Sequence, residues 1–113
     1  THEQLIHHPL RGALFENFVI AETQKHYTHH RADPPLFFWR DQTGHEVDLL
    51  IDHAGELFPV EIKSGATVQS SMLDTLHWWN KLTQTPSESA TLIYGGDEFS
   101  ERHGIAIRPW FAI

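Results

Sequence analysis

The chain contains no cysteine among its 113 residues. Disulfide bonds and thiolate metal sites are therefore excluded, and a reducing cytoplasm is the compartment that we expect. The sequence also has no apolar run of membrane-spanning length and no signal-peptide pattern at its start. We therefore expect no membrane partner.

Positive charge is scarce. The chain has 8 Lys and Arg residues against 15 Asp and Glu residues, which gives a formal net charge of −7. Because phosphate groups are bound mainly by Lys and Arg, this balance disfavours a protein whose whole surface binds nucleic acid. The basic residues are spread from Arg11 to Arg108, so they can still supply a local basic rim.

Methionine is nearly absent as well. The chain begins at Thr1, and its single methionine is Met72. We therefore expect a C-terminal fragment of a longer protein. A length of 113 residues with 40% hydrophobic content is typical of one small globular domain spanning residues 1–113.

Residues 10–27 have the apolar spacing of a helix, and Pro9 stands just before it. Apolar residues surround most of the helix, so we expect it to be largely buried. Glu16 interrupts this pattern between Val19 and Ile20 on the helical wheel. Its carboxylate is expected at the edge of the core or in a polar site, although a glutamate near a helix N-terminus can simply offset the macrodipole.

Three strands in an antiparallel meander are expected next, at about 36–41, 45–52 and 57–63. A turn centred on Thr43 and Gly44 would pair Trp39 with Asp48. The second turn contains Ala54-Gly55, within the segment from His53 to Glu56. Its loop has two or four residues, and both lengths give the same register.

That register places Asp48 directly opposite Glu61. Side chains alternate along a strand, so Glu61, Lys63 and Asp48 should share one face. Opposed positions have Cβ atoms about 4.5–5.5 Å apart, where like charges destabilise a sheet. Two carboxylates this close indicate a cation between them, and the alternative is a salt-bridged strand pair on a solvated face.

The rest of the chain predicts a helix at about 69–82, a strand at 90–94 and a candidate strand at 105–107. We expect Thr67 or Ser70 to cap the helix. Its apolar stripe comprises Leu73, Leu76, Trp79 and either Met72 or Leu82. The ten histidines are interpreted as surface residues. The whole order predicts an α/β fold, with a mixed sheet and helices on both faces.

This order of elements, together with Glu16, Asp48 and Glu61-Ile62-Lys63, resembles the PD-(D/E)XK nuclease superfamily. The resemblance covers about residues 10–95 and implies a restriction-endonuclease-like core. In that superfamily an acidic residue of the first helix, an aspartate of the second strand and an E-x-K of the third strand surround a metal ion.

A closer resemblance is to the C-terminal domain of a family of prokaryotic AAA-type P-loop ATPases, whose function is largely unassigned. It rests on four segments, which are residues 12–19, 38–41, 44–48 and 60–65. The chain has no G-x-x-x-x-G-K-[ST] motif of its own. An ATPase domain would therefore lie upstream in the parent chain, and homo-oligomers would form through that parent.

The nuclease resemblance implies a weakly bound Mg²⁺ or Mn²⁺ ion, since both prefer oxygen ligands. Asp48 and Glu61 would bind the ion, and the backbone carbonyl of Ile62 is a third candidate ligand. Glu16 would reach the ion through water or hold a second ion. Lys63 would orient the attacking water or stabilise negative charge on the phosphate.

Two functions follow as expectations. The first is metal-dependent phosphodiester hydrolysis, of DNA rather than RNA, in a domain attached to an ATPase. The second is a catalytically silent regulatory domain that binds nucleic acid or protein, favoured by the acidic charge and by exposed-looking Trp78, Trp79 and Trp110. A toxin-like effector is a third hypothesis without a specific signal. The sequence leaves the substrate form and the oligomeric state open.

Overall fold

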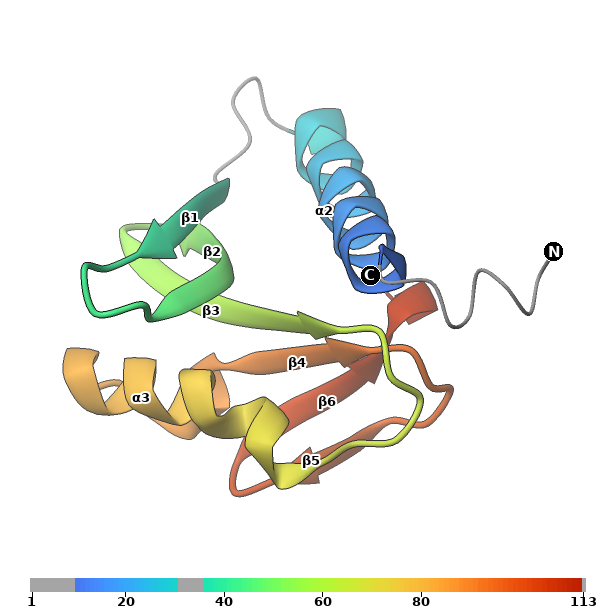
Figure 1. The fold of residues 1–113 in the computed structure, drawn as a ribbon. Coiled ribbons are helices and arrows are strands. Elements are labelled where there is room, and N and C mark those ends of the chain that lie inside the picture. The colour runs from blue at the N-terminus through green and yellow to red at the C-terminus, as the bar shows by residue number, and fades with distance from the viewer. Residues whose placement is uncertain (1–9, 31–35, 113) are drawn as a thin grey trace, which may run out of the picture.

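The computed structural model describes residues 10–30 and 36–112, with side chains described for 10–27 and 36–112. This part of the chain forms two α-helices and six strands, which are labelled in Figure 1. In chain order they are α2 (Arg11–His30), β1 (Leu36–Arg40), β2 (Glu46–His53), β3 (Glu56–Lys63), α3 (Asp74–Thr83), β4 (Thr91–Tyr94), β5 (Ser100–Arg102) and β6 (Ile105–Pro109). Short 3₁₀ turns are η1 (Ser70–Leu73), η2 (Ser87–Ser89) and η3 (Trp110–Ala112).

The strands form one mixed sheet in the order β1-β2-β3-β4-β6-β5. The first three are antiparallel neighbours, as the meander predicts, whereas β4 runs parallel to both β3 and β6. The predicted α/β fold with a mixed sheet is confirmed. Strand β5 was not predicted, because its three residues are all exposed and carry no apolar pattern.

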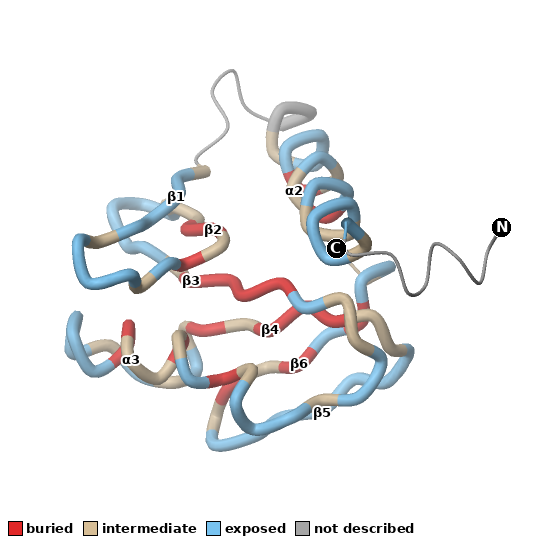
Figure 2. The backbone as a smooth tube through the Cα atoms, in the orientation of Figure 1, coloured by how far each residue is buried: buried red, intermediate tan, exposed pale blue. Residues whose placement is uncertain are grey.

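The two helices cover opposite faces of the sheet (Figure 1). On one face, Val19 of α2 packs against Val60, Ile62 and their buried neighbours Leu49 and Ile93. On the other face, η1 and α3 supply the buried side chains of a second core, which comprises Leu73, Leu76, Ala90, Leu92, Tyr94, Ile105 and Ile107. Figure 2 shows that burial concentrates along the central strands of the sheet.

Helix α2 is less buried than expected, so that prediction was wrong. Only Val19 and Thr23 are buried among its described side chains, and Leu14 and Phe18 are 53% and 46% exposed. The reason is that only one side of α2 contacts the sheet. Within the described residues, no further layer of the structure covers the opposite side of the helix. Apolar spacing alone therefore overestimated the burial of this helix.

The first turn of the meander also differs from expectation. Trp39 pairs with Val47 and not with Asp48. The carboxylate of Asp41 accepts hydrogen bonds from the backbone N–H groups of Thr43 and His45, at 3.0 and 2.8 Å. These bonds centre the turn on Thr43 alone, which changes the pairing by one residue.

The second hairpin has the predicted register, from His53↔Glu56 to Leu49↔Val60. Its loop is the two-residue version, because Ala54 and Gly55 both have positive φ, at 54° and 87°. Such a loop matches the twist of antiparallel strands.

The predicted helix at 69–82 is divided into η1 and α3, and Gln69 rather than Thr67 or Ser70 is its N-cap residue. Met72 packs against the second core, whereas Leu82 is 57% exposed. Trp79 is only 4% exposed and packs with Val47 and Leu50. Its place in the predicted apolar stripe is therefore confirmed, and the expectation that Trp79 is exposed was wrong.

Gly95 is expected to tolerate no side chain. A Cβ at Gly95 would overlap the Ser64 carbonyl oxygen, where β4 ends beside β3. Gly95→Ala should therefore destabilise the domain by about 1–3 kcal/mol. The matched control is Gly12→Ala in α2, where nothing lies within 4 Å, and it should be neutral or stabilising by up to about 1 kcal/mol. Urea unfolding measures both, and equal effects would contradict this account.

Candidate active site between two strands

Strands β2 and β3 separate at Asp48. Their ladder ends at the pair Leu49↔Val60, and from Val60 to Lys63 strand β3 pairs in parallel with β4. Beyond the ladder, the Asp48 Oδ2 atom accepts a hydrogen bond from the Ile62 N–H at 2.8 Å. Backbone N–H groups of a strand point sideways within the sheet. The Asp48 carboxylate therefore lies in the gap between the strands, where a backbone partner would otherwise be.

An irregularity in β2 places Asp48 in that gap. Phe37 pairs with Leu50 and Trp39 with Val47, so Asp48 and Leu49 together face the single residue Phe38. This two-against-one arrangement is a β-bulge, which re-aims side chains and interrupts pairing. It also explains why Val47 and Leu50 pack with the same residue, Trp79, although they are three positions apart. Simple alternation of side chains, on which the sequence prediction relied, does not hold across the bulge.

Glu61 is buried beside Asp48. Its side chain is 3% exposed, and burial raises its pKa to about 9, aided by a hydrogen bond with Asp48 and by the charge of that residue. Lys63 and a hydrogen bond with Thr75 act in the opposite direction and are weaker. Glu61 therefore carries a proton at neutral pH, and the two carboxyl groups are in contact.

Glu16 and Lys63 lie around this pair. Glu16 is half-buried on α2, and its pKa is raised by burial, then by the charge of Asp48, while Lys63 lowers it. Lys63 is exposed at the end of β3. The structure thus brings all four predicted side chains into one electrostatic neighbourhood, with Asp48 and Glu61 in direct contact.

Arg11 holds α2 beside the end of β3, which the sequence did not indicate. Its guanidinium donates hydrogen bonds to the Ser64 carbonyl oxygen at 3.0 Å and to the Ser64 Oγ at 3.4 Å. Ser64 directly follows Lys63, so this contact positions the helix that carries Glu16. No sequence signal could have found it, because 53 positions separate the two residues.

The available ligands for a cation are oxygen atoms. Because the N–H and C=O groups of one strand residue point to the same side, the Ile62 carbonyl faces the gap together with its N–H. In the described part of the chain, no group of three His, Cys, Asp or Glu side chains is close enough to enclose an ion. The Asp48–Glu61 pair and the Ile62 carbonyl still suit a hard divalent ion, which completes its shell with water. Glu16 senses the charge of Asp48, but among the described residues it does not complete a group of three with the pair.

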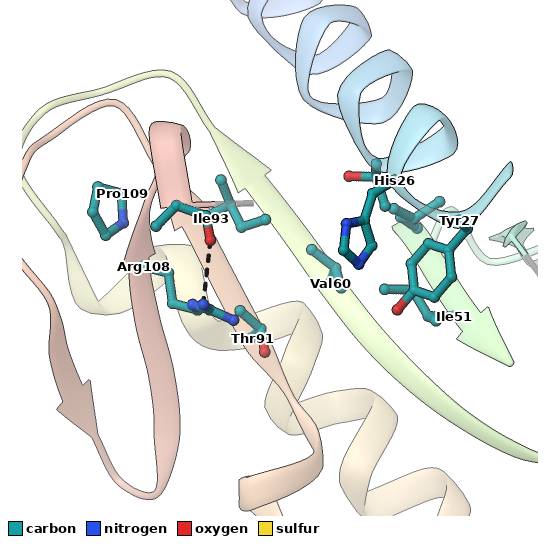
Figure 3. A pocket seen from close by; sticks show the side chains of 11 residues that line it. His26, Tyr27, Ile51, Val60, Thr91, Ile93, Arg108 and Pro109 are labelled. Atoms are coloured by element: carbon teal, nitrogen blue, oxygen red, sulfur yellow. Dashed lines mark hydrogen bonds between the residues drawn. The ribbon is translucent and has the colours of Figure 1, made fainter. Parts of the chain in front are cut away.

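A pocket of about 180 Å³ lies apart from the carboxyl pair, between the end of α2 and the sheet (Figure 3). Its lining includes His26 and Tyr27 of α2, Val60 of β3, Ile93 of β4 and Arg108 of β6. The lining contains no Asp or Glu residue, so this pocket lacks the carboxylates that a hard metal ion needs.

Within the described residues, no helix has both the length and the apolar character to cross a membrane.

The fold and the site define the class of domain, a mixed α/β domain in which a buried Glu61 and a half-buried Asp48 meet where two strands separate. The chain belongs to the family described as a domain of unknown function, DUF4143, whose model matches residues 11–111. Membership is consistent with the resemblance to the C-terminal domain of AAA-type ATPases. Neither the curated proteins nor the solved structures contain a match to this chain.

The raised pKa of Glu61 predicts a pH-dependent stability. The folded state favours the protonated acid, so its contribution is complete below about pH 4.5 and is lost as the pH rises towards about 9. In metal-free buffer, the free energy of unfolding should fall across this range by up to about 1.4 kcal/mol per pH unit. Glu61→Gln should remove that slope and make the domain more stable above neutral pH.

Urea unfolding at several pH values, in the presence of a chelator, measures the slope. Glu88→Gln, at an exposed position of η2, is the matched control and should leave the slope unchanged. Parallel profiles for wild type and Glu61→Gln would mean that Glu61 ionises normally in the fold.

Proposed function

We propose that this domain is a divalent-metal-dependent phosphodiester hydrolase of the PD-(D/E)XK nuclease superfamily, acting on DNA with Mg²⁺ or Mn²⁺. The observation that carries the proposal is the buried Glu61 in contact with Asp48, with a pKa raised to about 9. Such perturbed acids are typical of functional sites. A salt-bridged surface pair explains them less well, since Lys63 forms no ion pair with either residue among the described contacts.

Each residue of the site has a role in this reaction. Asp48 and Glu61 would hold the ion together with the Ile62 carbonyl, and Glu16 would act on it through water. A bound Mg²⁺ or Mn²⁺ supplies Lewis acidity to the phosphoryl oxygen and lowers the pKa of water. Lys63, exposed beside the pair, would orient the attacking water or stabilise negative charge on the phosphate.

The ATPase domain of the parent chain is the proposed partner. A net charge of −7 gives this domain little long-range attraction for phosphates. An upstream domain that holds the nucleic acid would raise the concentration of substrate at the site. Catalysis by the isolated 113-residue chain is therefore expected to be slow.

A catalytically silent binding domain is the second candidate, and a specific observation favours it. Exposed apolar side chains of α2 and η3 form a connected surface, with ring centroids 5.9 Å apart for Phe18 and Trp110 and 5.8 Å apart for Trp110 and Phe111. Contiguous exposed apolar surface of this kind is typical of protein interfaces. It would serve a regulatory domain that binds a protein, and it is compatible with catalysis at the carboxyl pair.

Metal binding should release a proton. The ion needs both carboxyl groups ionised, whereas Glu61, with a pKa raised to about 9, is protonated at neutral pH. The affinity for Mn²⁺ should therefore be weak at neutral pH and rise up to about tenfold per pH unit below that pKa. Calorimetry in two buffers of different ionisation enthalpy counts the released protons.

Asp48→Asn should abolish Mn²⁺ binding, because the amide removes one charge while keeping an oxygen for the Ile62 N–H. Asp97→Asn, at an exposed position after β4, should bind as wild type does. If Asp48→Asn binds Mn²⁺ normally, the ion is held elsewhere.

Cleavage tests the reaction itself. The chain should cleave DNA slowly in Mn²⁺, and fusion to the parent ATPase should accelerate the cleavage. Lys63→Ala should lower the rate by about 100-fold, as for the loss of one charge-stabilising group. Lys81→Ala, an exposed lysine of α3, is the control and should cut normally. A full-length protein that binds DNA but never cuts it in any divalent metal would support the silent binding domain.

A further inference from the structure

Strand β1 exposes three consecutive aromatic side chains. Phe37, Phe38 and Trp39 are 51%, 66% and 38% exposed, although β1 pairs with β2 along its length. β1 is an edge strand, and within the described residues no other strand covers it. Large aromatic rings at an edge strand are usually at least partly covered by other parts of a protein. The exposure of these three rings therefore indicates a binding surface.

The exposed strand lies beside Asp48, one member of the carboxyl pair. Phe38 is the residue that faces Asp48 and Leu49 across the β-bulge. Phe38, Trp39 and Arg40 line one open pocket of about 290 Å³ together with Glu16 and Asp48. The same bulge that turns Asp48 into the gap therefore also places an exposed aromatic ring beside it.

We propose that this pocket binds one unpaired nucleotide, whose base stacks on Phe38 while its phosphate is held at the carboxyl pair. The substrate would then be single-stranded nucleic acid, an assignment that rests on the proposed hydrolase function. Aromatic rings stack on bases only where these are unpaired, since a duplex hides the base faces. The ring of Trp39 contacts that of Trp79 in α3, at a centroid distance of 5.5 Å, and this contact holds β1 in place.

The charges around the pocket set a second condition. Glu16, Glu46 and Asp48 repel a phosphate, and Arg40 is the basic residue of the lining. Arg40 pairs with Glu46, but both side chains are exposed, at 75% and 51%, so the pair is weak and the guanidinium can turn to a phosphate. Nucleic-acid binding at this pocket therefore depends on a divalent cation, which neutralises the carboxylates.

The principal test is binding of labelled oligonucleotides, measured by fluorescence anisotropy in Ca²⁺ with the 113-residue chain. A single strand should bind more tightly than a duplex of the same sequence and more tightly than an abasic strand of the same length. Phe38→Ala should weaken single-strand binding by about 5-fold or more, as expected for the loss of one stacked base. Phe38→Trp should retain binding, and a chelator should abolish it.

The matched control is Phe99→Ala. Phe99 is 62% exposed, close to the 66% of Phe38, but it precedes β5 at the opposite edge of the sheet. This variant should bind single strands as wild type does. Thermal unfolding should give the same midpoint for both variants within a few degrees, because neither ring is buried.

The outcomes separate this inference from the proposed function. Equal binding of single strand, duplex and abasic strand, or equal loss in Phe38→Ala and Phe99→Ala, would overturn the stacking site. Binding of no oligonucleotide would overturn it too and would leave the edge of β1 for a protein strand. Phe38-dependent binding of single strands without cleavage in Mn²⁺ would keep the nucleotide site and reject the hydrolase.

Discussion

The hydrogen bond from the Ile62 N–H to the Asp48 carboxylate is the contact on which the candidate site depends. It replaces the backbone bond between Ile62 and Val47 that the register of β2 and β3 would give two residues beyond Leu49. Because an unpaired backbone N–H in a sheet is costly, the carboxylate lets the two strands part without that cost. β3 then continues in its pairing with β4, while the gap separates it from β2.

The same gap explains why a buried acid is tolerated at Glu61. A carboxyl group that is 3% exposed resists ionisation, and the neighbouring Asp48 strengthens that resistance. The protonated acid can donate to Asp48, so the pair is satisfied when a proton lies between its oxygens. A divalent cation satisfies the ionised pair in the same way. Proton and metal therefore compete for one place, and pH links stability to metal affinity.

Local patterns in the sequence predicted the sheet well where the contacts are short-range. The hairpin of β2 and β3 follows from Ala54-Gly55, and the register of that hairpin brings Asp48 level with Glu61. The expectation of an exposed Trp79 and that of a largely buried α2 were both wrong, because burial depends on which surfaces another element covers. A helical pattern reports only where apolar residues lie on the helix.

The sequence by itself determined the order of elements apart from β5, the mixed sheet and the identity of the acidic and basic residues in the candidate site. Only the tertiary structure decided how they meet. The bulge at Asp48 and Leu49 breaks the alternation of side chains, and no glycine or proline marks its position in the sequence. Arg11 reaches Ser64 across 53 positions, and the environment of Glu61 is made by residues of three elements. Such contacts depend on the distance between elements in space, which no local pattern of residues contains.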